Sequence, residues 1–251
     1  MNSPIHSMDG ILLVDKPADW TSHDVCAFVR SHFKIKKVGH AGTLDPLATG
    51  LLVLLLGRAT KQSIPLSSCD KEYYGVMELG IKTDSHDRKG KVIAEAPWEA
   101  VSLEQIRVQA LRFTGEILQI PPMVSALKHK GVRLYELARR GIQIPREERK
   151  ITVHEFTIKE KQGPFVRFSA WVSKGTYLRT LVNDLGDALG CFAALAELRR
   201  IRSGEFKLED SVGVDQLRQM TAGDLRQRMM IARPSSLLSY ADLHNARNVP
   251  S

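Results

Sequence analysis

Hydrophobic and polar positions divide this chain into short blocks, some with the alternation of strands and others with helical spacing. Apolar or β-forming runs bounded by turn residues predict strands at 10–14, 51–56, 71–80, 151–158 and 166–172. The run 51–56 is apolar throughout, which is typical of a strand that is buried on both faces. A polar turn at 84–90 precedes Val92 and Ile93, so we expect a hairpin there.

Helical spacing of apolar residues predicts helices that begin near Ser22, Ser102 and Thr176, which are residue types that cap helix N-termini. The third helix should end at Gly190 and carries Arg179 in its first turn. A cation at that end of a helix opposes the helix dipole, so we expect Arg179 to have an anionic partner. Two further short helical patterns follow residue 212.

The most distinctive segment, residues 38–50, reads Val-Gly-His-Ala-Gly-Thr-Leu-Asp-Pro-Leu-Ala-Thr-Gly. Its three glycines let the backbone approach a ligand closely. Asp45 is its only acid, and Pro46 keeps the residue before it extended, which limits where the carboxylate can point. We interpret Asp45 as a candidate catalytic carboxylate. An ordinary Asp-Pro turn before a buried strand is the alternative.

Composition and charge narrow the class of protein. The chain is 43% hydrophobic, which is sufficient for a core, and its 36 Lys and Arg against 28 Asp and Glu give a net charge of +8, which favours a polyanionic partner such as nucleic acid. Three cysteines without a CxxC pair indicate neither a disulfide framework nor a zinc site and point to a reducing cytoplasm. No apolar run approaches the roughly 20 residues that span a bilayer, and the N-terminus does not have the pattern of a secretory signal. We therefore expect a soluble cytoplasmic protein that binds no membrane.

Residues 38–50 resemble the central motif of the tRNA pseudouridine synthase B (TruB) family, whose members isomerise the T-loop uridine, position 55, of tRNA. In the pattern Gly-His-x-Gly-Thr-Leu-Asp-Pro-x-Ala-Thr-Gly, Asp45 takes the place of the family's catalytic aspartate. Other family motifs are matched at 16–22, 71–73, 121–128, 174–179 and 198–206. Asp19 stands where the family usually has glycine, a departure that affects the local turn.

The resemblance covers about residues 10–210 and implies an α+β protein with the pseudouridine synthase fold, a mixed, mainly antiparallel sheet flanked by helices. It also implies that residues 1–210 form the catalytic domain and that a basic arm at about 120–150 binds the T-loop. For residues 211–251 we expect a short helical C-terminal extension rather than the complete RNA-binding PUA domain that family members often carry.

The same resemblance assigns the site. Asp45 would be catalytic, Arg179 would pair with it, and the ring of Tyr73 would lie against the target base. The implied substrate-binding residues are His40, Tyr177, Leu198, Lys16, Lys128 and Arg133. From the residues alone, each of these positions also has an ordinary explanation, such as core packing, a loop histidine satisfied by backbone groups, or a surface ion pair.

Converting uridine to pseudouridine breaks the N1–C1′ bond and rejoins the ring through C5, with all atoms conserved and no net redox. We therefore expect no cofactor and no metal. The reaction requires an anionic group near C1′ or C6, which Asp45 would supply, and a guanidinium favours the charged form of such a carboxylate. The expected partner is the T-stem-loop of tRNA, bound by a monomer with no obligate protein partner.

Two other classes of function remain open from the sequence. A metal-dependent hydrolase would use ligands drawn from His40, Asp45, Asp84, His86 and Asp87. The segment 84–87 has the composition of a hairpin turn, however, and activity that survives EDTA would exclude this class. A non-catalytic RNA-binding protein or tRNA-folding chaperone suits the basic charge equally well, whereas the intact catalytic set favours an enzyme.

Overall fold

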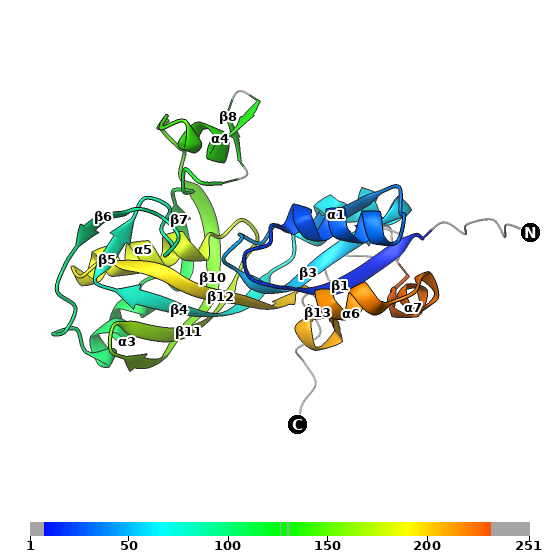
Figure 1. Ribbon diagram of the computed structural model, residues 1–251. Coiled ribbons are helices and arrows are strands. Elements are labelled where there is room, and N and C mark those ends of the chain that lie inside the picture. Colours follow the sequence, from blue (N-terminus) through cyan, green and yellow to red (C-terminus); the bar gives the residue numbers. More distant parts are fainter. Residues whose placement is uncertain (1–7, 126, 130, 232–251) are drawn as a thin grey trace, which may run out of the picture. The chain divides into compact units, whose positions relative to one another are not determined.

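The computed structural model describes residues 8–125, 127–129 and 131–231 (Figure 1). The chain forms two compact units. The first is built from the residues up to Lys71 together with those from Arg199 onward, and the second consists of Glu72–Leu198. None of the described helices is long and apolar enough to cross a bilayer.

The sheet of the first unit is organised around one strand, β3 (Thr49–Leu56). Its other strands are β1 (Gly10–Lys16), β2 (Val38–Ala41), the end of β12 (Ala193–Ser203), β13 (Phe206–Lys207) and β14 (Val212–Gly213). Strand β3 pairs antiparallel with β1 and β2 and parallel with β12. All residues of β3 from Gly50 to Leu56 are buried, which confirms the prediction that both faces of this strand are covered.

Short helices complete the first unit: α1 (Ser22–His32), η1 (Gly57–Gln62), α2 (Ser63–Ser67), η2 (Leu208–Asp210), α6 (Val214–Gln219) and α7 (Ala222–Arg228). The N-cap of α1 is Thr21, whose hydroxyl accepts a hydrogen bond from the backbone of Asp24 while the Asp24 carboxylate accepts one from the Thr21 backbone. The prediction that Ser22 caps this helix is therefore wrong. Asp19 has a φ of 65°, a left-handed conformation that Asp tolerates, so the turn accepts Asp at the place where the resembled family motif has glycine.

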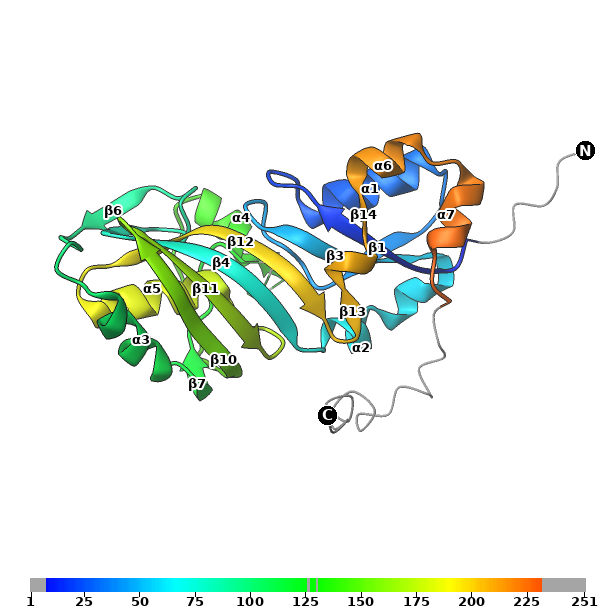
Figure 2. The same ribbon diagram turned by 90° about the horizontal axis from the view of Figure 1, so that it is seen from below.

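In the second unit the strands lie in the order β12, β4 (Lys71–Leu79), β11 (Phe165–Val172), β10 (Arg149–Gln162) and β7 (Gly115–Gln119). Strand β10 pairs antiparallel with both β11 and β7. The predicted pairing of 151–158 with 166–172 is thereby confirmed. Helix α3 (Leu103–Leu111) packs on β10, next to which it lies in Figure 2, and also contacts α5 (Leu178–Leu189).

Two small hairpins stand outside this main sheet. Strands β5 (Ile81–Thr83) and β6 (Val92–Glu95) enclose the polar turn at 84–90, as expected. Strands β8 (Lys128–His129) and β9 (Val132–Arg133) form the second hairpin, which leads into α4 (Leu134–Arg139). Strands, mainly antiparallel, and helices thus occur together in the α+β class that was predicted.

Alternation along β4 follows the prediction, since Tyr73 is 8% exposed and Tyr74 is 55% exposed. Helix α3 is capped by Ser102, as predicted, with Gln105 completing the capping box. Helix α5 begins one residue later than expected, because Tyr177 is its N-cap and Thr176 is not. It ends at Gly190, whose φ of 74° is the left-handed conformation that was anticipated.

Candidate active site

Asp45 lies on a loop whose ends are held close together by the sheet of the first unit. We call residues 42–50, which comprise the connection from β2 to β3 and the first two residues of β3, the Asp45 loop. Strands β2 and β3 pair antiparallel from Val38↔Leu56 to Ala41↔Val53, so the loop leaves and re-enters the same part of the sheet. Within the loop the Asp45 carbonyl accepts a hydrogen bond from the Ala48 N–H at 3.0 Å, and Asp45 itself is half-buried.

Ser22 holds the residue that precedes Asp45. The Ser22 hydroxyl accepts a hydrogen bond from the Leu44 N–H at 2.8 Å and donates one to the Leu44 carbonyl at 3.1 Å. Ser22 is 2% exposed, so both groups of Leu44 depend on this hydroxyl rather than on water. This explains why Ser22 does not cap its own helix.

Lys16 holds the residue that follows Asp45. Its side chain is wholly buried, and Nζ donates to the carbonyls of Pro17 at 2.8 Å, Trp20 at 2.6 Å and Pro46 at 3.4 Å. Burial lowers the pKa of Lys16 to about 8, against an opposing effect of Asp45, the charged group with the largest influence on it. With Nζ enclosed by these three carbonyls, Lys16 supports the loop, and its role in binding substrate stays a prediction.

Arg200, on β12, contacts both ends of the loop. Its Nε donates to the Leu51 carbonyl at 2.7 Å and one terminal nitrogen donates to the Gly42 carbonyl at 3.1 Å. The residue is 1% exposed. Three buried polar side chains, those of Lys16, Ser22 and Arg200, therefore fix the backbone on either side of Asp45.

His40 precedes the loop on β2, opposite Leu54 of β3. Its Nδ1 is buried and has no hydrogen-bond partner among the described residues. Burial, and after it the positive charge of Arg200, lowers the pKa of His40, so the ring is neutral at pH 7. A neutral imidazole can enter a stack of bases without the desolvation of a charge.

Arg179 lies in the second unit and is almost completely buried, with 3% exposure. Its guanidinium donates to the carbonyls of Ser85 at 3.2 Å and Val124 at 2.6 Å, and lies 5.6 Å from the ring centre of Tyr177. The Tyr177 backbone is held in turn by both ends of the Gln119 amide, at 2.9 and 3.2 Å. Such burial argues against the surface ion pair considered for Arg179.

The remaining residues of the predicted site also belong to the second unit. Tyr73 on β4 and Leu198 on β12 are both 8% exposed. The backbones of Lys128 and Arg133 are paired between β8 and β9, while their side chains lie outside the described part of the structure. The first unit thus brings together Lys16, His40 and the Asp45 loop, and the second places Arg179 beside Tyr177.

Two family models match this chain from residue 30 to residue 232. The N-terminal domain of the TruB family pseudouridylate synthases matches residues 30–178, which is more than half of the chain, and the tRNA pseudouridylate synthase B C-terminal domain matches 179–232. The chain belongs to the TruB family of pseudouridylate synthases. The resemblance found in the sequence and the enzyme class that it implies are thereby confirmed.

Curated relatives support the same assignment. The tRNA pseudouridine synthase B of Opitutus terrae is 45% identical over 230 residues, covering 92% of this chain and 95% of the relative. That of Geotalea uraniireducens is 44% identical over 234 residues, covering 93% of this chain and 75% of the relative. Conservation at this level extends over both units of the structure.

Solved structures show the fold shared with this TruB family member. The crystal structure of a Cbf5-Nop10-Gar1 complex contains a chain that is 30% identical, with a TM-score of 0.70 over 88% of this chain. The archaeal box H/ACA sRNP Nop10-Cbf5 complex contains one that is also 30% identical, with a TM-score of 0.66 over 91% of this chain. This chain spans about three fifths of the length of those chains, 60% and 62%, and the predicted pseudouridine synthase fold is confirmed.

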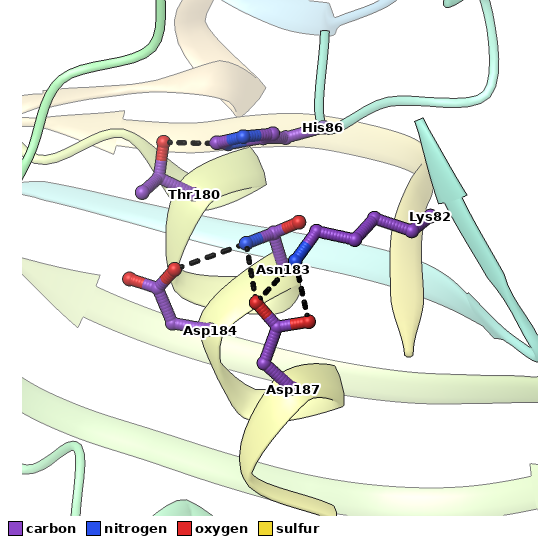
Figure 3. A network of polar contacts seen from close by, with 6 residues as sticks. All are labelled: Lys82, His86, Thr180, Asn183, Asp184 and Asp187. Carbon is purple, nitrogen blue, oxygen red and sulfur yellow. Dashed lines mark hydrogen bonds and ion pairs between the residues drawn. The ribbon is translucent and has the colours of Figure 1, made fainter. Parts of the chain in front are cut away.

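A polar network joins the turn at 84–90 to α5, the helix that carries Arg179 (Figure 3). The Nδ1 of His86 lies 3.2 Å from the Thr180 hydroxyl, and Lys82 donates to both oxygens of Asp187 at 2.6 and 2.8 Å. Burial, followed by the positive charge of Arg179, lowers the pKa of His86 to about 4, so this histidine is neutral at physiological pH. The described residues contain no group of three His, Cys, Asp or Glu that could hold a metal ion.

Three residues that support this site of the TruB-family protein were not predicted from the sequence. Ser22 was interpreted as a helix cap, Arg200 only as part of a matched motif, and Gln119 was not singled out. Each acts through a backbone group that is distant in sequence, 22 residues away for Ser22, 158 for Arg200 and 58 for Gln119. No local pattern marks such a contact, and the only indication was a polar residue inside or beside an apolar run.

Proposed function

We propose that this chain converts the T-loop uridine, position 55, of tRNA to pseudouridine. The observation that carries the proposal is the Asp45 loop, whose lone carboxylate stands between backbone groups fixed by buried Ser22 and Lys16. A fixed carboxylate suits a reaction that needs one preorganised anion at a defined atom. The curated relatives, named tRNA pseudouridine synthase B, support tRNA as the substrate.

In the proposed mechanism the target base leaves its stack, at a cost of a few kcal/mol, and enters the site. Asp45 then acts at C1′ or C6, as a nucleophile or as the stabiliser of developing charge. Arg179 would pair with this carboxylate, as the family resemblance implies. The ring of Tyr73 lies against the uracil and Leu198 lines its pocket.

The remaining contacts hold the RNA around the flipped base. Neutral His40 enters the folded T-loop as the base leaves it, and Tyr177 lines the site beside Arg179. Lys128 and Arg133 carry charge on the basic arm at about 120–150, which contacts phosphates of the T-stem-loop. Because such contacts release counterions, affinity should fall steeply with salt.

We further propose that the protein works on tRNA as a cytoplasmic monomer, without cofactor or metal. Residues 1–210 would form the catalytic domain and 211–251 a C-terminal extension, of which the described part holds α6 and α7. Nop10 and Gar1 are named as partners of the similar solved chain, and the proposal does not extend them to this chain.

The decisive experiment incubates the protein with a T-stem-loop RNA in EDTA, without added metal or nucleotide, and measures pseudouridine. We expect full conversion by the wild type and a loss of at least about 100-fold in rate for Asp45→Asn, with RNA affinity largely kept. Asp215→Asn is the matched control, since its side chain is 98% exposed on α6.

Each outcome bears on a different alternative. Wild-type protein that binds the RNA without forming pseudouridine would favour the non-catalytic RNA-binding class. Activity that EDTA removes would favour the metal-dependent class. If Asp45→Asn loses affinity and activity together, a purely chemical role for Asp45 is contradicted.

A further inference from the structure

We propose that Arg200 is a positioning residue for catalysis, which sets the place of Asp45 by holding both ends of the Asp45 loop with one side chain. This inference rests on the proposed function, because it concerns how the catalytic carboxylate is held. Arg200 itself does not reach substrate in this proposal, since it is 1% exposed and its Nε and one terminal nitrogen donate to carbonyls of the protein.

The Arg200 guanidinium links two backbone carbonyls, one at each end of the Asp45 loop. Its Nε donates to the carbonyl of Leu51, just after the loop, and a terminal nitrogen donates to the carbonyl of Gly42, at its start. The span between these two carbonyls is therefore fixed by a rigid planar group. A lysine donates from a single nitrogen atom, so it cannot reproduce the two separate donor positions that Nε and the terminal nitrogen occupy here.

The backbone of Arg200 fixes the loop a second time. It pairs with Gly50 in the parallel register of β12 and β3. A Cβ added to Gly50, whose φ is +96°, would lie 2.3 Å from the Arg200 carbonyl oxygen. The end of the loop therefore packs directly on the Arg200 backbone, while its start packs on the Arg200 side chain, 3.5 Å from a Cβ built on Gly42.

Charge gives Arg200 a further effect on the loop. Its positive charge contributes to the lowered pKa of Lys16 and of His40, and Lys16 responds to Asp45 more than to any other charged group. The cations and the carboxylate of this unit are therefore close enough to influence one another. The charged groups that act on Lys16 are Asp45, Asp19, Arg200 and Asp24.

The neighbouring Arg199 supplies a matched control. It lies on the same strand and pairs with Thr49, but its side chain is 43% exposed and forms an ion pair with Asp15 at 2.7 Å. An exposed pair of this kind contributes little. The Arg199 side chain meets the Asp45 loop only at the Thr49 hydroxyl, to which it donates at 3.4 Å, and no hydrogen bond joins it to a backbone carbonyl of the loop among the described contacts. Replacing either arginine by lysine removes a guanidinium. A difference in rate or in loop exchange between the two variants therefore reflects where the guanidinium lies and not its chemistry.

The test compares Arg200→Lys, Arg200→Met and Arg199→Lys in the full chain. Three quantities are measured: the single-turnover rate on T-stem-loop RNA, the Kd for that RNA, and amide hydrogen exchange of peptides that cover the Asp45 loop. For Arg200→Lys we expect a rate reduced about 10- to 100-fold, because small misplacement of a reacting group has effects of this size. Its Kd should stay within about threefold, since Arg200 does not touch RNA.

Exchange of the loop amides should be faster in both Arg200 variants and unchanged in Arg199→Lys. A residue that merely stabilises the fold would not separate the rate from Kd at a temperature where the protein is folded. A rate and loop exchange in Arg200→Lys equal to those of the wild type would overturn the proposal. Equal losses in rate and affinity with unchanged exchange would also overturn it, because they indicate a contact with RNA.

Folding failure is also informative. If Arg200→Met does not fold, Arg200→Lys alone is compared with the wild type. If Arg200→Lys does not fold either, the result counts against a positioning role, because Arg200 would then be required for the folding of the whole unit. Inactive wild-type protein would contradict the proposed function alone. The exchange comparison would still decide whether Arg200 holds the loop.

Discussion

Replacing Ser22 by alanine isolates one of the supports of the Asp45 loop. The hydroxyl makes two hydrogen bonds with the backbone of Leu44, at 2.8 and 3.1 Å, in a place that is 2% exposed. Alanine fills nearly the same volume but leaves one buried N–H and one buried carbonyl without this partner. Each such group costs about 1–3 kcal/mol, and the better helix propensity of alanine offsets about 0.5 kcal/mol of the total. We therefore expect the free energy of unfolding to fall by about 1.5–5.5 kcal/mol.

Urea unfolding of wild type and Ser22→Ala, followed by circular dichroism, measures this difference. Ser31→Ala is the control, because Ser31 lies on the exposed face of the same helix, and we expect a change within about 0.5 kcal/mol. Leu44 is next to Asp45, so the single-turnover rate of Ser22→Ala should also fall under conditions where both proteins are folded. A destabilisation below about 1 kcal/mol would refute the argument, since the two backbone groups would then have found other partners.

Two other predictions follow from groups whose surroundings are equally well defined. The pKa of His86 is lowered from 6.5 to about 4, so between these pH values the unfolded chain binds a proton that the folded chain does not. The free energy of unfolding therefore falls as the pH falls through this range, by about 3 kcal/mol in total. Asn tolerates the φ of 67° at this position, and unfolding curves of His86→Asn from pH 4 to 7 should lack this slope; a slope equal to that of the wild type would contradict the assignment. Gly50→Ala places a Cβ 2.3 Å from a backbone oxygen at φ +96° and should lower the free energy of unfolding by more than about 3 kcal/mol. Gly163→Ala, at φ +57° with no atom within 4 Å, is the control and should lower it by only about 1–2 kcal/mol. Equal melting temperatures for the two variants would refute the steric argument.

Much of the local structure was predictable because it depends on residues that are close in sequence. The uniformly apolar run in β3 indicated a strand covered on both faces, and Gly190 ended α5 in the expected conformation. Tyr73 and Tyr74 face opposite sides of β4, as alternation along a strand requires. The order of residues in 38–50 was enough to identify the family and the candidate carboxylate.

Predictions failed where two neighbouring residues could serve the same local purpose. Thr21 and Ser22 are both capable of capping α1, and Thr21 does so because the hydroxyl of Ser22 is bound to Leu44. At α5 the cap position falls on Tyr177, whose backbone is held by the Gln119 side chain from β7. In both helices the residue at the N-cap, or its neighbour, has a contact with a distant segment that the local sequence does not reveal.

The sequence by itself determined the family and the candidate catalytic residue, since the type and order of side chains around Asp45 match the family motif on a glycine-containing loop. Only the tertiary structure decided how that carboxylate is held. Arg200 meets Gly42 across 158 residues of sequence because β12 pairs with β3 in one register. Shifting that register by one residue would turn Arg200 to the other face of the sheet, and register is set by the packing of the whole unit rather than by any short segment.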